Sequence, residues 1–83
     1  MVDMHATREA RKIEIIVNGK KTKIPPTWTI DDLIQDLELQ RKQIAIEVNE
    51  QIISRERWSE QPLGSGDRIE IVHFVGGGRK TNV

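Results

Sequence analysis

Three consecutive glycines near the carboxyl end are the residues with the clearest potential for chemistry. The stretch FVGGGRKTNV places Gly76, Gly77 and Gly78 directly after a strand-like run, with five residues behind them. Because glycine has no Cβ, an extended glycine segment can pass a narrow channel and bring its carbonyl carbon to a reactive centre. A phosphate-binding loop needs a following helix, and five residues leave no room for one. We interpret the glycines as a slender probe; the simpler alternative is an inert flexible tail.

The composition excludes several other kinds of chemistry. The 83-residue chain is 36% hydrophobic and 31% charged, and its 13 basic and 13 acidic residues give a net charge of zero. A broad nucleic-acid surface needs a basic excess, so we expect no nucleic-acid partner. The lack of cysteine excludes a thiolate metal site and a cysteine nucleophile. No stretch is long and apolar enough to span a bilayer, so we expect a cytoplasmic protein with no membrane partner.

The elements that would position the glycines follow from hydrophobic periodicity. Alternation of apolar and polar residues predicts two hairpins and a final strand. The expected strands are residues 13–17, 21–24, 44–48, 51–53 and 68–75. The Asn18-Gly19 pair tolerates positive φ and is a strong signal for a tight hairpin turn. The second hairpin turns at Asn49 and Glu50.

One helix is expected between the two hairpins, in the stretch TWTIDDLIQDLEL. Thr29 can cap it, and Asp32 lies three residues further on, as in a capping box. One helical stripe is apolar and consists of Ile30, Leu33, Ile34 and Leu37. The order β-β-α-β-β-β, with one stripe to cover one sheet face, predicts an α+β fold of the β-grasp type. In this fold a mixed sheet of four or five strands curls around one helix.

The chain is therefore expected to form one domain with two tails. The polar residues 1–11 show no strand period and are expected to be a flexible arm. Residues 12–75 form the β-grasp domain, and residues 76–83 are expected to be a flexible, glycine-rich tail that extends beyond Gly78.

The sheet face without a helix is the expected partner-binding surface. Alternation directs Ile16, Ala45, Val72 and Phe74 toward water on this face. Apolar side chains that gather on adjacent strands often mark a contact surface for another protein. The alternative is that the arm or the RERW loop folds over them, with Trp58 as the lid.

Other polar residues fit structural roles. His73 has no acidic partner or nucleophile beside it in sequence, so we expect a half-exposed strand histidine rather than a base. Asp31, Asp32 and Asp36 lie opposite the apolar stripe of the expected helix, where a solvated face is the usual explanation. We expect no metal site and no cofactor bound by this chain.

Several segments together resemble the ThiS family of sulfur carriers. They are IEIIVNGKKTKIP, TIDDLI, IAIEVNEQIISRERW and GDRIEIVHFVGGG, and the resemblance covers residues 12–78. It implies a protein co-substrate rather than an enzyme. An adenylating partner related to ubiquitin-activating enzymes (ThiF-like), which binds ATP and Mg, would activate the terminal glycine carboxylate. Sulfur from a sulfurtransferase or cysteine desulfurase would then form a thiocarboxylate, which thiazole synthase (ThiG-like) uses in thiamin biosynthesis.

The resemblance assigns the acyl role to Gly78, with Gly77 and Gly76 as the narrow approach, but the sequence departs from the family after Gly78. RKTNV follows, and an internal glycine has a peptide carbonyl in place of a free carboxylate. We expect a C-terminal peptidase to remove residues 79–83. A cloning remnant and loss of the sulfur chemistry are the alternatives.

Other functions of the same fold stay open at this point. The sulfur acceptor could be molybdopterin, an amino acid or a tRNA base. The chain could instead be a ubiquitin-like modifier joined to lysines of target proteins. A plain interaction domain with an inert tail is the remaining possibility.

Overall fold

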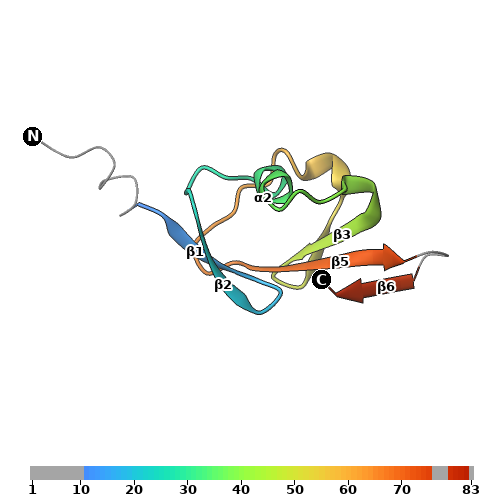
Figure 1. Ribbon diagram of the computed structural model, residues 1–83. Helices are drawn as coiled ribbons and strands as arrows, with labels where there is room; N and C mark the ends of the chain where they lie inside the picture. Colours follow the sequence, from blue (N-terminus) through green and yellow to red (C-terminus); the bar gives the residue numbers. More distant parts are fainter. Residues whose placement is uncertain (1–10, 76–78, 83) are drawn as a thin grey trace, which may run out of the picture.

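A computed structural model describes residues 11–75 and 79–82 of the chain. The described part contains a mixed sheet in the order β2-β1-β5-β3-β4, with β6 paired to β5 off this path, and one α-helix, α2, packed on one face (Figure 1). This is the β-grasp arrangement expected from the sequence, with β6 as an additional strand.

The first hairpin forms where the sequence predicts it. Strands β1 (Ile13–Val17) and β2 (Lys20–Ile24) pair antiparallel. Asn18 and Gly19 make the turn with φ of 48° and 82°. Two central residues with positive φ match the twist of the flanking strands, which confirms the role predicted for the Asn-Gly pair.

The helix α2 (Ile30–Asp36) begins with the predicted cap. The Thr29 backbone N–H donates to the Asp32 carboxylate at 2.9 Å, and the Asp32 N–H donates to the Thr29 hydroxyl at 3.4 Å. The helix is shorter than the apolar stripe predicted. Leu37 is its C-cap and is 42% exposed, because the chain turns away at Glu38, whose φ is 56°.

The second hairpin is also confirmed. After the 3₁₀ turn η1 (Arg41–Gln43), strands β3 (Ile44–Val48) and β4 (Gln51–Ile53) pair antiparallel through a turn at Asn49 and Glu50. Both turn residues have positive φ, 51° and 70°.

The strand β5 (Arg68–Val75) is the centre of the sheet. It runs parallel to β1 and antiparallel to β3. The crossover through α2 leads from β2 to β3, and the segment that contains η2 then returns the chain as β5, between β1 and β3.

The hydrophobic core lies between the sheet and α2. It takes three residues of α2, the inward side chains of four strands and two residues of the segment between β4 and β5. Its members are Ile15, Ile24, Ile30, Leu33, Ile34, Ile44, Ile46, Val48, Trp58, Leu63, Ile69 and Ile71. Trp28 packs against its edge.

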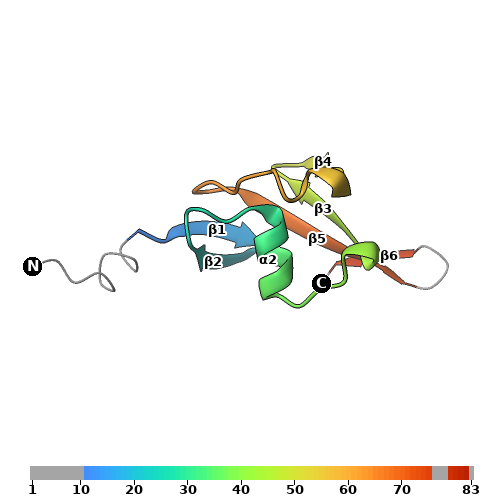
Figure 2. The same cartoon turned by 90° about the horizontal axis from the view of Figure 1, so that it is seen from above.

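The tail beyond the glycines contains a strand that the sequence does not predict. Arg79–Asn82 forms β6, which pairs antiparallel with the end of β5 (Figure 2). We expected these residues to belong to the flexible, glycine-rich tail. The pairing depends on a free edge of β5, which is a property of the assembled sheet.

Candidate partner-binding face and glycine tail

The glycine tail leaves the sheet from its central strand. The residues that we predicted to carry the acyl chemistry, Gly76, Gly77 and Gly78, lie outside the described residues. The described chain leads to them through β5, which pairs with β1 at its beginning and with β3 as far as His73.

Three of the four predicted contact residues come together on the open face. Ala45 of β3 lies directly opposite Val72 of β5 in the register, and Phe74 follows two residues later on the same face. All three side chains are half-buried. They form a small apolar surface beside the point where the chain leaves β5; below we call Ala45, Val72 and Phe74 the exit patch.

The fourth predicted residue, Ile16, is separate from the exit patch. Ile16 pairs with Arg68 at the beginning of β5, four residues before Val72. Four residues of strand correspond to about 13 Å. The charged side chains of Arg68 and Glu70, both exposed, alternate with the inward residues between these two positions. The open face therefore has two apolar regions rather than one continuous patch.

The sequence reading missed an exposed apolar residue on the same face. Ile52 of β4 is 72% exposed and lies opposite Glu47 of β3. It is therefore a diagonal neighbour of Ala45, within reach of the exit patch. Alternation within QII contained the signal: Ile53 packs against the core, so its neighbour Ile52 must point the other way.

Two carboxylates border the exit patch. Glu47 and Glu70 lie directly opposite each other on β3 and β5, on the open face. Like charges at directly opposite positions of a sheet are destabilising. At the other side of the sheet, Glu14 instead lies opposite Lys23. The exit patch therefore has an acidic border that local pairing in the described sheet does not neutralise.

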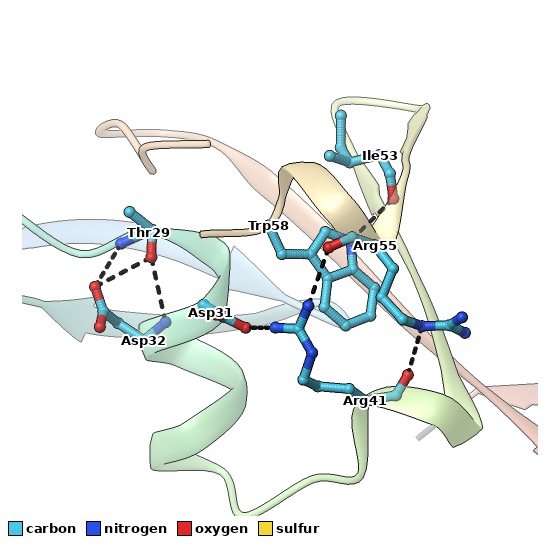
Figure 3. A network of polar contacts seen from close by, with 7 residues as sticks. All are labelled: Thr29, Asp31, Asp32, Arg41, Ile53, Arg55 and Trp58. Atoms are coloured by element: carbon cyan, nitrogen blue, oxygen red, sulfur yellow. Dashed lines mark hydrogen bonds and ion pairs between the residues drawn. The ribbon is translucent and has the colours of Figure 1, made fainter. Parts of the chain in front are cut away.

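Trp58 does not cover the open face, contrary to the alternative considered from the sequence. It is 1% exposed and belongs to the core on the α2 side of the sheet. Its indole N–H donates to the carbonyl of Ile53 at 2.9 Å (Figure 3). The Trp58 carbonyl accepts from the backbone N–H of Asp31 at 3.1 Å. The 3₁₀ turn η2 (Arg55–Arg57) carries the chain back over the helix side of the sheet, so the indole points inward.

Two arginines hold the Trp58 segment in place. The guanidinium groups of Arg41 and Arg55 lie 5.1 and 5.7 Å from the centre of the indole ring (Figure 3). Arg41 also forms an ion pair with Asp31, and Arg55 donates to the Arg41 carbonyl at 2.9 Å. Because these groups are used within the fold, we assign them a structural role.

A hollow of about 370 Å³ lies on the α2 side of the sheet, away from the exit patch. It is bordered by the first hairpin and by the end of α2, including Lys20 and Asp36. Because the hollow and the exit patch lie on opposite faces of the sheet, we do not include the hollow in the candidate site.

The remaining polar residues behave as structural residues. His73 is half-buried on the α2 side of the sheet, opposite Ile44. Asp32 is part of the cap of α2 and Asp31 pairs with Arg41. Among the described residues, no group of three or more potential ligands could hold a metal ion. The same part of the chain contains no helix able to cross a membrane.

Comparison with known proteins identifies relatives along nearly all of the domain. The family model described as "ThiS family" matches residues 8–78. The sulfur carrier protein ThiS of Bacillus subtilis is 48% identical over 63 residues, which is 75% of this chain and 96% of that protein. The crystal structure of a thiamine biosynthesis protein, ThiS, from Geobacter metallireducens superposes with a TM-score of 0.71 at 26% identity, over 80% of this chain and 100% of that one.

A further relative is much longer than this chain. A thiazole synthase of Paramagnetospirillum magneticum is 27% identical over 66 residues, which is 80% of this chain and 20% of the enzyme. That enzyme thus carries, within one polypeptide, a segment similar to most of this domain.

The mixed sheet with the capped helix α2 packed on one face defines a β-grasp protein. The matched segments and the glycines at residues 76–78 narrow the class further. The chain belongs to the ThiS family.

Proposed function

We propose that this ThiS-family sulfur carrier of thiamin biosynthesis carries sulfur on Gly78, after residues 79–83 have been removed. The observation that carries the proposal is the family match, which extends to Gly78 and includes none of the five residues behind it. A chain that ends at Gly78 has a free carboxylate where the full chain has a peptide carbonyl.

The proposed chemistry takes place on this carboxylate. A carboxylate is a poor electrophile, so the carboxylate oxygen attacks the α-phosphate of ATP, and pyrophosphate leaves. The acyl adenylate then has a good leaving group: a persulfide sulfur of the donor protein attacks the acyl carbon and AMP leaves. A partner thiol then attacks the S–S bond, which releases the thiocarboxylate and forms a disulfide on the partner. The sulfur must come from a sulfurtransferase or cysteine desulfurase, because the chain contains no cysteine. ATP and Mg belong to the adenylating partner in this scheme.

We propose that the exit patch and its acidic border form the docking surface for that partner. Ala45, Val72 and Phe74 lie next to the departure of the tail, so a protein that receives the glycines would contact them at the same time. The facing carboxylates of Glu47 and Glu70 favour basic groups on the partner surface. Ile52 extends the apolar area on the far side of β3.

Thiazole synthase is the proposed sulfur acceptor. The single polypeptide of the Paramagnetospirillum magneticum thiazole synthase, which includes a segment similar to this domain, supports a direct physical association of the two functions. Because activation uses ATP, we place the carrier in the cytoplasm.

The proposal is tested by comparing three forms of the chain: one that ends at Gly78, one that ends at Gly77 and the full chain to Val83. Each is mixed with the cognate adenylating enzyme, ATP and magnesium, and pyrophosphate release is measured. We expect rapid release only with the chain that ends at Gly78. Activity of the full chain, or inactivity of the Gly78 form with a competent enzyme, would overturn the assignment.

A genetic test separates the thiazole pathway from the other sulfur acceptors. Deletion of the gene, in a cell with no second carrier, should abolish growth unless thiamin or thiazole is supplied. Mass spectrometry of the protein from cells should show a chain that ends at Gly78, with oxygen replaced by sulfur in a fraction of molecules. Isopeptide adducts on other proteins would instead identify a modifier.

A further inference from the structure

The edge of β5 that faces β1 is covered in three successive steps. At its beginning, the strand β1 pairs with it, with Ile16 opposite Arg68 and Val17 opposite Ile69. The β1 strand then ends, but the side chain of Asn18 continues the pairing. Its amide oxygen accepts from the Ile71 N–H at 2.7 Å, and its amide nitrogen donates to the Ile71 carbonyl at 3.3 Å.

The strand β6 covers the rest of that edge. Backbone groups alternate between the two edges of a strand, so those of His73 and Val75 point to the same side as those of Ile71. The register places His73 opposite Thr81 and Val75 opposite Arg79. On the other edge, Asn49 donates to the Arg68 carbonyl at 2.8 Å, so the backbone groups of Val72 point toward β3. In the full chain, β6 therefore provides backbone partners for His73 and Val75.

This pairing is incompatible with an extended tail. Directly opposed residues of an antiparallel pair have Cα atoms about 5 Å apart. Four steps of extended chain, from Val75 to Arg79, span about 13 Å. Presentation of an extended tail through residue 78 thus requires that Val75 and Arg79 separate, and with them at least the first pair of the β5–β6 ladder.

We propose that Arg79–Asn82 is an intramolecular cap, which occupies the free edge of β5 and keeps the unprocessed chain from offering its glycine segment to a partner. Hydrolysis of the peptide bond after Gly78 would create the carboxylate that is adenylated. The same step would remove the strand that pairs with β5. This inference rests on the proposed function, because it gives the trimmed segment a role before trimming.

The cap has the properties of a strand that can detach from β5 and pair with it again. It is only four residues long, and a short two-stranded hairpin is marginally stable in water. Its sequence, RKTN, is polar and carries two positive charges, which is how natural edge strands avoid pairing with other molecules. Such a strand can open for a peptidase without unfolding the core.

The test uses amide hydrogen exchange on four forms of the protein: the full chain, Thr81→Pro, Lys80→Pro and the chain that ends at Gly78. Thr81 lies opposite His73, so the proline removes an N–H that points toward β5. Lys80 lies opposite Phe74, and its N–H points away from β5, so a proline there leaves the ladder intact. It is the matched control.

We expect the amides of His73 and Val75 to be protected in the full chain and in Lys80→Pro. In Thr81→Pro and in the shortened chain they should exchange at least about tenfold faster. The Val72 amide, which points toward β3, should exchange at the same rate in all four forms. Equal exchange of His73 and Val75 in all four forms would overturn the cap.

A binding measurement tests the inhibitory role of the cap separately from the formation of β6. We expect the cognate adenylating enzyme to bind Thr81→Pro at least threefold more tightly than it binds the full chain or Lys80→Pro, a difference of about 0.7 kcal/mol. Equal affinities, with the exchange pattern as expected, would overturn the inhibitory role. Failure of the proposed function is a different result: the chain that ends at Gly78 would show free His73 and Val75 amides but no pyrophosphate release.

Discussion

The two faces of the sheet differ in what their side chains do. On the α2 side, the core residues of the strands are at most 6% exposed, and even the polar groups of Trp58 and the arginines over it have partners within the fold. On the open side, the exit patch is half-buried, Ile52 is 72% exposed and two carboxylates face each other. The first face provides stability. On the second face, contact with another protein would bury the apolar side chains and could place basic groups beside the two carboxylates.

Trp58→Ala should give the largest effect, on the α2 side. Loss of a fully buried indole and of its hydrogen bond to Ile53 should lower the free energy of unfolding by about 3–5 kcal/mol. Most of the stability of a domain of this size would be lost. Chemical denaturation measures the change, and Trp58→Phe, which keeps an aromatic ring, should lose clearly less. A loss below about 1 kcal/mol for Trp58→Ala would show that Trp58 is not a central core residue.

Asn18→Ala should give the next largest effect, because Asn18 joins the first hairpin to β5. The substitution removes both hydrogen bonds to the Ile71 backbone and leaves alanine at a φ of 48°. We expect a loss of about 2–3 kcal/mol in the free energy of unfolding. Asn18→Gly, which accepts the positive φ, should lose less, and the difference measures the backbone strain minus the entropy that glycine adds to the unfolded chain. Equal losses of stability for the two variants would contradict a contribution from backbone strain at Asn18.

Val72→Ala should separate the two regions of the open face. Val72 is in the exit patch, whereas Ile16 lies about 13 Å away along β5, and both are half-buried. We expect Val72→Ala, in the chain that ends at Gly78, to weaken binding of the adenylating enzyme about tenfold. Ile16→Ala should change the affinity by less than about twofold. Calorimetric titration measures both, and equal effects would contradict a contact surface centred on the exit patch.

Glu47→Gln should give the smallest effect. It should raise the stability of the fold but weaken binding of the partner. It removes the like-charge pair with Glu70, so the free energy of unfolding should rise by a few tenths of a kcal/mol. The same change should weaken binding of a basic partner and reduce the dependence of the association rate on salt. Glu14→Gln is the matched control, because Glu14 faces Lys23 and its loss should lower stability slightly. If both substitutions stabilised the protein, the expected effect of charge pairing would be contradicted.

Sequence periodicity predicted the elements but not the extent of every contact. Asn18-Gly19 and Asn49-Glu50 lie at the turns, and the Thr29–Asp32 cap begins α2, because all three depend on residues close together in the chain. Leu37 was misassigned since helical spacing alone does not show where a helix ends. The alternative of Trp58 as a lid over the open face was wrong, and the sequence could not decide it because an irregular segment has no period that shows the direction of its side chains.

The candidate site was predicted in part for the same reason. Alternation identified Ala45, Val72 and Phe74, but not that Ile16 is separate from them, which depends on the register of β1 against β5. The glycines at 76–78 and their acyl role remain a prediction from the sequence and the family, since they lie outside the described residues.

The sequence by itself determined the local features: two turns, one helix cap, the inward and outward faces of each strand, and a family whose match extends to Gly78. These depend on backbone preferences and on side-chain period within a few residues. The tertiary structure decided which strands are neighbours, and therefore which outward residues form the exit patch. It also decided that RKTN forms a strand, because the partner for its backbone is an edge of β5 that exists only after the sheet has assembled.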